Sequence, residues 1–383
     1  MKKLELYLHI PFCEKKCSYC DFLSAPAGSE VKTAYVNRLE EEIRFRGPGC
    51  RGWEVSSIFI GGGTPSVLPG GAVLAVMDTV RDSFHIAADA EITIECNPGT
   101  LREEKLSFYR RAGINRISLG LQSASNKELK LLGRIHTYED FLLSYELARK
   151  CGFSNINVDL MSGLPGQTIK SWEQTLKKTA MLKPEHISAY SLIIEEGTPF
   201  YGIYGYDDET RRKGEKPLFL PSEEDERKMY HLTEQLLSSR GYARYEISNY
   251  ARPGRECVHN IGYWDRTEYL GLGLGAASLM NNRRFSNVRD LDAYMEGEFS
   301  YTDVQKLRTE DQMAEFMFLG LRMMRGISKH EFAENFYLTV GQVYGGAVAR
   351  LKEQGLLEEN TERLWLTPRG IDVSNYVFAE FLL

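Results

Sequence analysis

Residues 7–22 read Tyr-Leu-His-Ile-Pro-Phe-Cys-Glu-Lys-Lys-Cys-Ser-Tyr-Cys-Asp-Phe and place Cys13, Cys17 and Cys20 on one short segment. Three thiolates on one loop can bind three irons of a cubane cluster and leave the fourth iron without a protein ligand. Zinc is the alternative, but a structural zinc site usually closes four ligands. His9 is a candidate fourth ligand, yet it falls in an apolar run that predicts a strand ahead of the loop. The segment therefore predicts a metal centre on the loop after the first strand.

From that first strand onward, short apolar runs alternate with amphipathic helical stretches through the first 200 residues. Such alternation predicts βαβ units and a parallel sheet. Six or seven strands without a closing eighth predict an α/β fold built as a partial (β/α) barrel of about six parallel strands. The predicted strands are 4–9, 55–60, 91–95, 116–120, 156–160 and 186–192, and the helices between them are 32–46, 72–84, 103–112, 138–151 and 169–181.

The pattern changes twice after the predicted barrel. A polar segment, 205–216, predicts a loop, and a helix follows over 223–240. From 303 onward, three helices precede a short predicted hairpin, which is typical of a winged-helix-like module. We therefore expect three domains: a barrel core over 1–210, an extension packed on it over 211–300, and a C-terminal helical, winged-helix-like module over 301–383.

Composition excludes several classes of protein. The 383 residues carry a net charge of −6, which gives no general attraction to nucleic acid. Winged-helix modules often bind DNA, but residues 339–383 hold four Arg or Lys against six Asp or Glu, so we expect no nucleic-acid partner. Apolar stretches are too short for a transmembrane segment, which leaves peripheral contact with a membrane open. Three of the seven cysteines crowd together, which favours metal ligands in a reducing compartment, the cytoplasm.

The cysteine loop and the next strand together resemble a known family. An aromatic residue, Phe22, follows Cys20, and Gly-Gly-Gly-Thr-Pro stands at 61–65 after the second predicted strand. This combination is similar to the radical S-adenosylmethionine superfamily, in the branch of oxygen-independent coproporphyrinogen III oxidase. The resemblance implies a [4Fe-4S] cluster held by Cys13, Cys17 and Cys20, with S-adenosylmethionine bound at the open iron.

The same resemblance implies a set of S-adenosylmethionine-binding residues. Most of them follow predicted strands, and the carboxyl ends of strands are where barrels build their sites; Arg134 instead follows a helix. Glycines without side chains also let backbone groups approach a ligand closely. The implied residues are Tyr7, Gly62, Gly63, Thr64, Glu95, Gln122, Arg134 and Asp159.

Within this branch, the chain resembles the HemW group of heme chaperones more than the oxidases. Oxidases carry a long extension before the cluster and a further cysteine two residues after the third; here Cys13 is near the start and Phe22 stands in that place. Residues 259–264 match the H-N-x-x-Y-W motif of the HemW group, which implies heme binding by His259, Asn260, Tyr263 and Trp264. An imidazole is a common axial ligand to heme iron, and aromatic rings offer flat apolar faces.

One departure concerns a second histidine. Members of the group commonly have Gly-Ala-His-Ser after a glycine run, whereas this chain has Ala277 in the histidine position. If that histidine helps to hold heme, this chain binds heme more weakly or through a different ligand set.

The leading expectation is a heme chaperone that binds heme, a [4Fe-4S] cluster and S-adenosylmethionine and transfers heme to acceptor proteins, with an electron donor protein as a further partner. The alternative is an oxygen-independent coproporphyrinogen III oxidase, which decarboxylates its substrate to protoporphyrinogen IX. A third hypothesis is a redox-labile cluster protein without heme. Slow cleavage of S-adenosylmethionine alone is compatible with the chaperone, because an open cluster corner permits it.

Overall fold

A twelve-stranded sheet forms the centre of the computed structural model, which describes residues 1–382. Its strands follow the order β12-β11-β10-β9-β1-β2-β3-β4-β5-β6-β8-β7, and the described part of the sheet stays open. Strands β9 and β1 to β6 are parallel. The partial (β/α) barrel is therefore confirmed, with β9 (Tyr269–Leu272) as a seventh parallel strand. The other six are β1 (Lys2–Ile10), β2 (Trp53–Gly62), β3 (Ile86–Cys96), β4 (Arg116–Gln122), β5 (Ile156–Ser162) and β6 (His186–Ser191).

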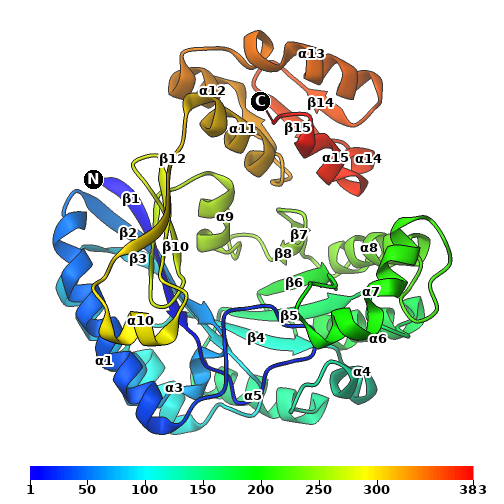
Figure 1. Cartoon of the computed structure of the whole chain (residues 1–383). Coiled ribbons are helices and arrows are strands. Elements are labelled where there is room, and N and C mark those ends of the chain that lie inside the picture. Colours follow the sequence, from blue (N-terminus) through cyan, green and yellow to red (C-terminus); the bar gives the residue numbers. More distant parts are fainter. Residues whose placement is uncertain (383) are drawn as a thin grey trace.

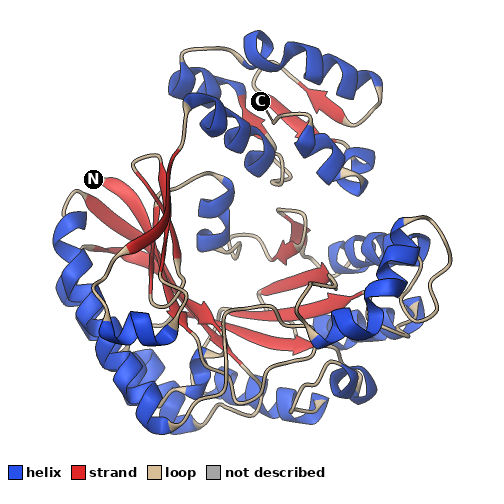
Figure 2. Cartoon of the chain, in the orientation of Figure 1, coloured by secondary structure: helices blue, strands red, loops and turns tan. Residues whose placement is uncertain are grey.

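Helices cover the outer face of the parallel strands, as Figures 1 and 2 show. Alternation along each strand explains this arrangement: on β1, Leu4, Leu6 and Leu8 are fully buried in the core against the helices. Glu5 and Tyr7, between them, project to the concave inner face, because successive side chains of a strand point to opposite faces. The covering helices are α1 (Ser29–Arg46), α2 (Gly70–Ser83), α3 (Glu103–Arg111), α4 (Asn126–Leu131), α5 (Tyr138–Lys150) and α6 (Ile169–Met181).

The inner face of the barrel is unusually polar. Strand register aligns Glu95 with Ser118, and Ser118 with Asn157, so polar side chains form layers across neighbouring strands. Parallel barrels normally fill this space with bulky apolar residues. The polar side chains of these layers must therefore find their hydrogen-bond partners among each other. Their members are Glu5, Ser57, Glu91, Thr93, Glu95, Arg116, Ser118, Asn157, Asp159, His186 and Ser188.

An extension of helices and short strands follows the barrel. The expected loop over 205–216 is wrong over 205–212, because α7 (Pro199–Arg212) continues through these residues. Thr198 caps this helix by accepting the Tyr201 N–H, and the Asp207 carboxylate accepts backbone N–H groups of 218–220. The remaining elements are α8 (Glu223–Ser238), β7 (Ala243–Arg244), β8 (Asn249–Ala251), α9 (Val258–Trp264), β10 (Ala277–Met280), β11 (Arg283–Asn287), α10 (Leu291–Glu296) and β12 (Tyr301–Lys306).

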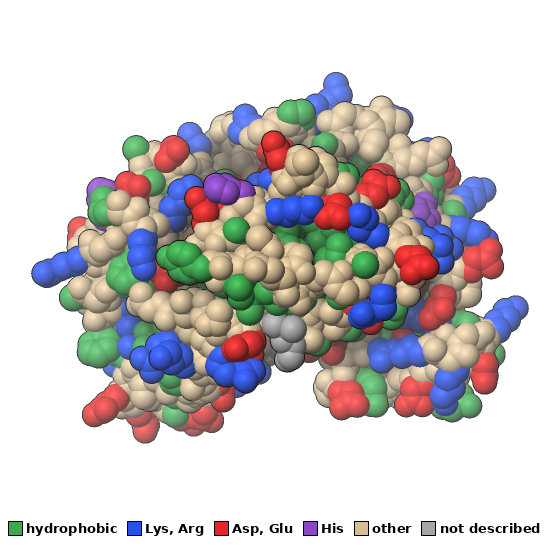
Figure 3. All heavy atoms as spheres, turned by 90° about the horizontal axis from the view of Figure 1, so that it is seen from above, with side chains coloured by type: hydrophobic (Ala, Val, Ile, Leu, Met, Phe, Trp, Pro, Cys, Tyr) green, Lys and Arg blue, Asp and Glu red, His purple; other side chains and the backbone are tan. Residues whose placement is uncertain are grey.

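The C-terminal module has a hydrophobic core of its own, formed by residues between Met313 and Phe381. Its three-stranded sheet, in the order β13-β15-β14, packs with helices as in the predicted winged-helix-like module. Figure 3 views the molecule from the side of this module, and acidic and basic side chains are interspersed over that face. The elements are α11 (Thr309–Gly320), β13 (Ile327–Ser328), α12 (Lys329–Phe336), α13 (Val340–Glu353), β14 (Leu357–Glu359), β15 (Arg363–Leu366), α14 (Pro368–Asp372) and α15 (Ser374–Ala379).

Two expectations about organisation stand as follows. The domain boundaries near 210 and 300 stay predictions. In the described part of the chain, none of the helices combines the length and the apolar character that crossing a membrane requires.

Candidate functional site

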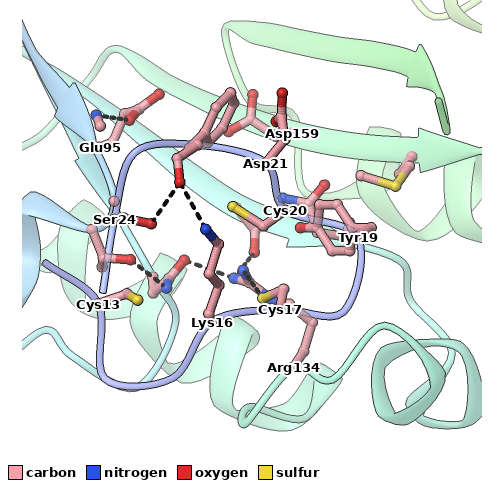
Figure 4. Close-up of a pocket in the computed structure, with 18 of the residues that line it drawn as sticks. Cys13, Lys16, Cys17, Tyr19, Cys20, Asp21, Ser24, Glu95, Arg134 and Asp159 are labelled. Atoms are coloured by element: carbon pink, nitrogen blue, oxygen red, sulfur yellow. Dashed lines mark hydrogen bonds between the residues drawn. The ribbon is translucent and has the colours of Figure 1, made fainter. Parts of the chain in front are cut away.

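A cavity of about 490 Å³ opens at the carboxyl ends of the parallel strands, beneath the cysteine loop. Its volume falls in the range of small-molecule sites. Figure 4 shows the loop arching over side chains that come from several strands. Seven of the eight residues predicted to bind S-adenosylmethionine line this cavity: Gly62, Gly63, Thr64, Glu95, Gln122, Arg134 and Asp159.

The cysteine loop is held at several points of its length. The Cys13 N–H donates to the Ala25 carbonyl at 3.2 Å, and the Ser18 N–H donates to the Leu132 carbonyl at 3.1 Å. The Lys16 ammonium also donates to the Phe22 carbonyl at 3.0 Å, across the loop. The loop is thus closed at its base by Ala25 and tied to the end of α4, which fixes where its thiols stand.

All three loop thiols are free and face the cavity. Burial raises the pKa of the Cys13 and Cys20 thiols, whereas the Arg134 guanidinium donates to the Cys17 sulfur at 3.6 Å. In the side-chain positions of this structure, no three His, Cys, Asp or Glu residues among 1–382 lie close enough together to hold a metal ion. Figure 4 shows the three cysteines spread along the loop, with their sulfur atoms apart from each other. The donor set fits an iron–sulfur cluster once the side chains turn inward, since thiolates are its ordinary ligands.

The glycine run packs against the cysteine loop. A Cβ atom on Gly63 would lie 2.5 Å from the Phe12 carbonyl oxygen, and one on Gly62, whose φ is +117°, would lie 2.7 Å from the His9 ring. The N–H of Thr64 donates to the Phe12 carbonyl at 2.7 Å. Glycine is therefore required here for close packing under the loop, as well as for a bare backbone at the cavity wall.

Two carboxyl groups, Glu95 and Asp159, lie half-buried in the cavity. Burial, together with the neighbouring Asp159, raises the pKa of Glu95 to about 8, although its carboxylate accepts the Gly62 N–H at 3.2 Å. Burial also raises the pKa of Asp159, and hydrogen bonds from Ser118 and Asn157, both 2.8 Å long, oppose that rise. These acceptors suit hydroxyl groups and a positively charged ligand.

Arg134 and Gln122 complete the cavity wall. Arg134 donates to the Asn97 side chain at 2.7 Å and to the Gly120 carbonyl at 2.8 Å, which orients it toward the loop. Gln122 adopts a positive φ of 69° and accepts the Tyr190 hydroxyl at 2.9 Å. An irregularity in the pairing of β4 with β5 turns this residue into the cavity.

Tyr7 is the predicted residue that does not line the cavity. Its hydroxyl hydrogen-bonds His9 at 3.0 Å, and its ring stacks on Phe59. Sequence reasoning in turn missed Ser118 and Tyr190, which do line the cavity. Period-two alternation along β4 and β6 was the signal that could have found them, because both occupy inward positions.

The motif at 259–264 forms helix α9, inside the concave face of the sheet (Figure 1). His259 is 1% exposed. Its Nδ1 lies 2.8 Å from the Ser57 hydroxyl and its Nε2 lies 3.1 Å from the Tyr263 hydroxyl, so both ring nitrogens are engaged. Burial lowers the pKa of His259 to about 3, which keeps the imidazole neutral.

The other motif residues connect the barrel to the C-terminal module. The Trp264 ring packs with Met323, and the Arg322 guanidinium lies 4.4 Å from its centre. Tyr263 stacks edge-on against His259, while Asn260 is half-buried on the same helix. Helix α9 therefore presents its histidine to the barrel and its tryptophan to the module.

Family models define the class of protein. Residues 7–179 match the Radical SAM superfamily, and residues 307–373 match the HemN C-terminal domain. A solved structure described as coproporphyrinogen III oxidase (HemN) from Escherichia coli, a radical SAM enzyme, superimposes with a TM-score of 0.84 at 26% identity, covering 100% of this chain and 90% of that one. The cysteine loop and the cavity thus belong to a radical SAM fold of this type.

Curated relatives define the family within that class. "Heme chaperone HemW" of Bacillus subtilis (strain 168) is 38% identical over 98% of each chain, and that of Escherichia coli (strain K12) is 39% identical over 86% of this chain and 85% of its own. "Heme chaperone HemW" of Lactococcus lactis is 35% identical over 98% of this chain and 97% of its own. This chain belongs to the HemW family.

Proposed function

We propose that this chain is a heme chaperone, which holds a [4Fe-4S] cluster and S-adenosylmethionine in the cavity, binds heme and passes it to acceptor proteins. One observation carries the cofactor part of the proposal: three free thiols and seven predicted ligand-binding residues converge on one cavity. Membership of the HemW family supports the heme part. The free thiols are also consistent with the reducing cytoplasm expected from the sequence.

Each cavity residue has a distinct task in this proposal. Cys13, Cys17 and Cys20 hold the cluster, and Arg134, at hydrogen-bonding distance from Cys17, offsets the negative charge of its sulfur. Glu95 and Asp159 hydrogen-bond the nucleoside hydroxyls in this proposal, and the sulfonium charge of the ligand would favour the ionised form of both carboxyl groups. When bound, the cluster and S-adenosylmethionine supply one-electron chemistry, which an electron donor protein would sustain.

His259 supplies the imidazole for heme in this proposal. The Ser57 hydroxyl at Nδ1 orients the ring, as the outer partners of metal-ligating histidines commonly do. Nε2 faces the Tyr263 hydroxyl, so ligation of iron requires Tyr263 to release it. Tyr263 and Asn260 stand on the same helix as further heme residues of this proposal, and Trp264 would have to leave its contact with Met323 to offer its ring to the porphyrin.

The cofactor part is tested by anaerobic reconstitution. Replacing Cys17 by Ser should abolish the four-iron cluster, because one iron loses its only protein ligand. Cys151→Ser is the matched control, since Cys151 ends α5 outside the cavity and should leave iron and sulfide content unchanged. Iron and sulfide at wild-type levels in Cys17→Ser would refute the assignment. Heme titration of the reconstituted protein, followed by absorption, tests the heme part, and saturation by heme is expected.

The alternative, an oxygen-independent coproporphyrinogen III oxidase, rests on the full-length structural match to HemN. Phe22 argues against it, because it is exposed at the cavity where the resemblance places a further cysteine in oxidases. We expect the reduced, reconstituted protein to leave coproporphyrinogen III unconverted in the presence of S-adenosylmethionine. Protoporphyrinogen that accumulates over many turnovers would favour the oxidase instead.

A further inference from the structure

A chain of hydrogen bonds crosses the polar interior of the barrel from the cavity to helix α9. It starts at Asp159, whose Oδ1 accepts the Asn157 amide at 2.8 Å. The side-chain carbonyl oxygen of Asn157, Oδ1, lies 2.6 Å from His186 Nδ1, and His186 Nε2 lies 2.8 Å from the Tyr245 hydroxyl. The Tyr245 hydroxyl in turn accepts the N–H of Cys257, the residue that caps α9, at 3.3 Å.

The donor and the acceptor of every hydrogen bond in this series can be assigned, starting from the side-chain carbonyl of Asn157. Because the Asn157 carbonyl only accepts, His186 donates from Nδ1 and accepts at Nε2. Tyr245 therefore donates to His186, and its oxygen is left to accept from Cys257. Burial lowers the pKa of His186 well below its usual value, so the ring stays neutral and keeps this single pattern. The donors all point from α9 toward Asp159, which polarises the chain toward the carboxylate.

A second branch ties the same end of α9 to strand β3. The Cys257 thiol and the His259 N–H both lie 3.3 Å from one oxygen of Glu91, which is itself 8% exposed. Farther along the helix, a Cβ on Gly262 would fall 2.1 Å from the Glu5 carboxyl group. Helix α9 is thus in close contact with the barrel interior at its start and again at Gly262, so a shift of α9 must disturb the interior hydrogen bonds.

We propose that Tyr245, His186 and Asn157 are positioning residues that couple helix α9 to Asp159, so that S-adenosylmethionine in the cavity and the conformation of α9 influence each other. The proposal rests on the proposed function, in which the cavity binds S-adenosylmethionine. Asp159 reaches the ligand at one end of the chain, and the motif helix stands at the other. Coupling between two sites is reciprocal. A ligand in the cavity should therefore stabilise α9, and breaking the series of hydrogen bonds should weaken ligand binding.

The test uses the full, cluster-reconstituted chain with S-adenosylmethionine as the probe. Hydrogen exchange of the α9 amides, 258–264, is measured with and without the ligand, and the dissociation constant is measured by calorimetry. In the wild type, S-adenosylmethionine should slow exchange in α9. Tyr245→Phe removes one hydroxyl and both of its hydrogen bonds; it should weaken binding by about two- to tenfold and abolish the slowing in α9.

Tyr250→Phe is the matched control, because Tyr250 is also buried, on β8, and its hydroxyl has no hydrogen-bond partner among residues 1–382. It should keep wild-type affinity and wild-type slowing. If the wild type binds S-adenosylmethionine but exchange in α9 does not change, the coupling is refuted while the proposed function stands. If the wild type fails to bind S-adenosylmethionine, the proposed function fails and the coupling fails with it. Equal behaviour of Tyr245→Phe and Tyr250→Phe would also refute the coupling.

Discussion

At the scale of single residues, the barrel interior keeps its polar groups uncharged where it cannot pair them. Glu5 and His259 lie 3.7 Å apart, a distance that suggests an ion pair. Burial, however, raises the pKa of Glu5 to about 9 and lowers that of His259 to about 3. Both groups are therefore neutral near pH 7, since desolvation of two charges outweighs their attraction at this separation.

This neutral pair predicts a specific pH dependence of stability. An unfolded chain ionises Glu5 near 4.5, whereas the folded chain keeps it protonated to about 9. Between these values folding must take up a proton at Glu5, so the contribution of this group to stability falls with rising pH, by at most roughly 1.4 kcal/mol per pH unit. His259 contributes in the opposite sense between about 3 and 6.5, and the comparison with Glu5→Gln cancels that contribution. Glu5→Gln is neutral in both states and should gain stability over the wild type as pH rises through this window. Urea unfolding at several pH values checks the difference; Glu296→Gln, at an exposed position, should run parallel to the wild type.

For single residues of the cavity, short sequence motifs were better predictors than the pattern of predicted strands and helices. Glu95 and Asp159 follow strands, and the geometry of parallel strands brings their ends together. Ser118 and Tyr190 belong to no distinctive motif; period-two alternation places them on the inward face of β4 and β6, but which inward residues reach the cavity depends on the register between strands. Tyr7 misses the cavity because its hydroxyl hydrogen-bonds His9 instead.

At the scale of elements, α9 is a short helix with a precise fit on both sides. Its histidine stacks on Phe59 at 5.2 Å, and Gly262 is the residue that allows contact with β1. Access of heme to His259 therefore depends on how firmly the Tyr263 hydroxyl occupies Nε2.

Removing that hydroxyl should favour heme. Tyr263→Phe frees Nε2 of His259, so if this nitrogen ligates iron, heme affinity should rise by about two- to tenfold, the contribution of one neutral hydrogen bond. His259→Gln should lower the affinity and change the heme spectrum, while cluster content stays at the wild-type level. Tyr109→Phe, in α3, serves as the control, because its buried hydroxyl has no partner in the described chain. Heme affinity and spectra that are unchanged in both motif variants would leave His259 with a structural role only.

Elements of the barrel were predictable, because strand and helix periods alternate cleanly: the helix predicted over 169–181 is α6, with the same bounds. The C-terminal helices and hairpin were predicted for the same reason. Helix α7 was not, since Gly202, Gly205 and Asp207 are typical of loops. The structure overrides that preference with a cap at Thr198 and with an Asp207 carboxylate that binds the following backbone. Strand β9 was hidden in a glycine-rich run, and only pairing with β1 defines it.

At the scale of the whole molecule, the C-terminal module is joined to the barrel through polar contacts around α9. Glu315, on α11, is 8% exposed and accepts from Arg266 at 2.9 Å and from Arg284 at 3.0 Å. Arg266 follows α9 directly, and Arg284 lies on β11. The Met324 N–H also donates to the Tyr245 carbonyl at 2.9 Å. One carboxylate thus links the module to two separate parts of the extension.

Removing this carboxylate should loosen the module. Glu315→Ala leaves two guanidinium groups facing each other without a counter-charge, and breaking a buried ion pair in this way costs about 3–5 kcal/mol. The Arg284 side chain is 36% exposed, so solvent screens its share, and we expect about 2–3 kcal/mol here. Because the module has its own core, the loss should appear as undocking: limited proteolysis should cut the segment between α10 and α11 faster and release a C-terminal fragment. Glu310→Ala, at an exposed position of the same helix, is the control. Equal cleavage rates in the two variants would mean that the apolar contacts of Trp264 with the module, rather than the Glu315 ion pairs, hold the two parts together.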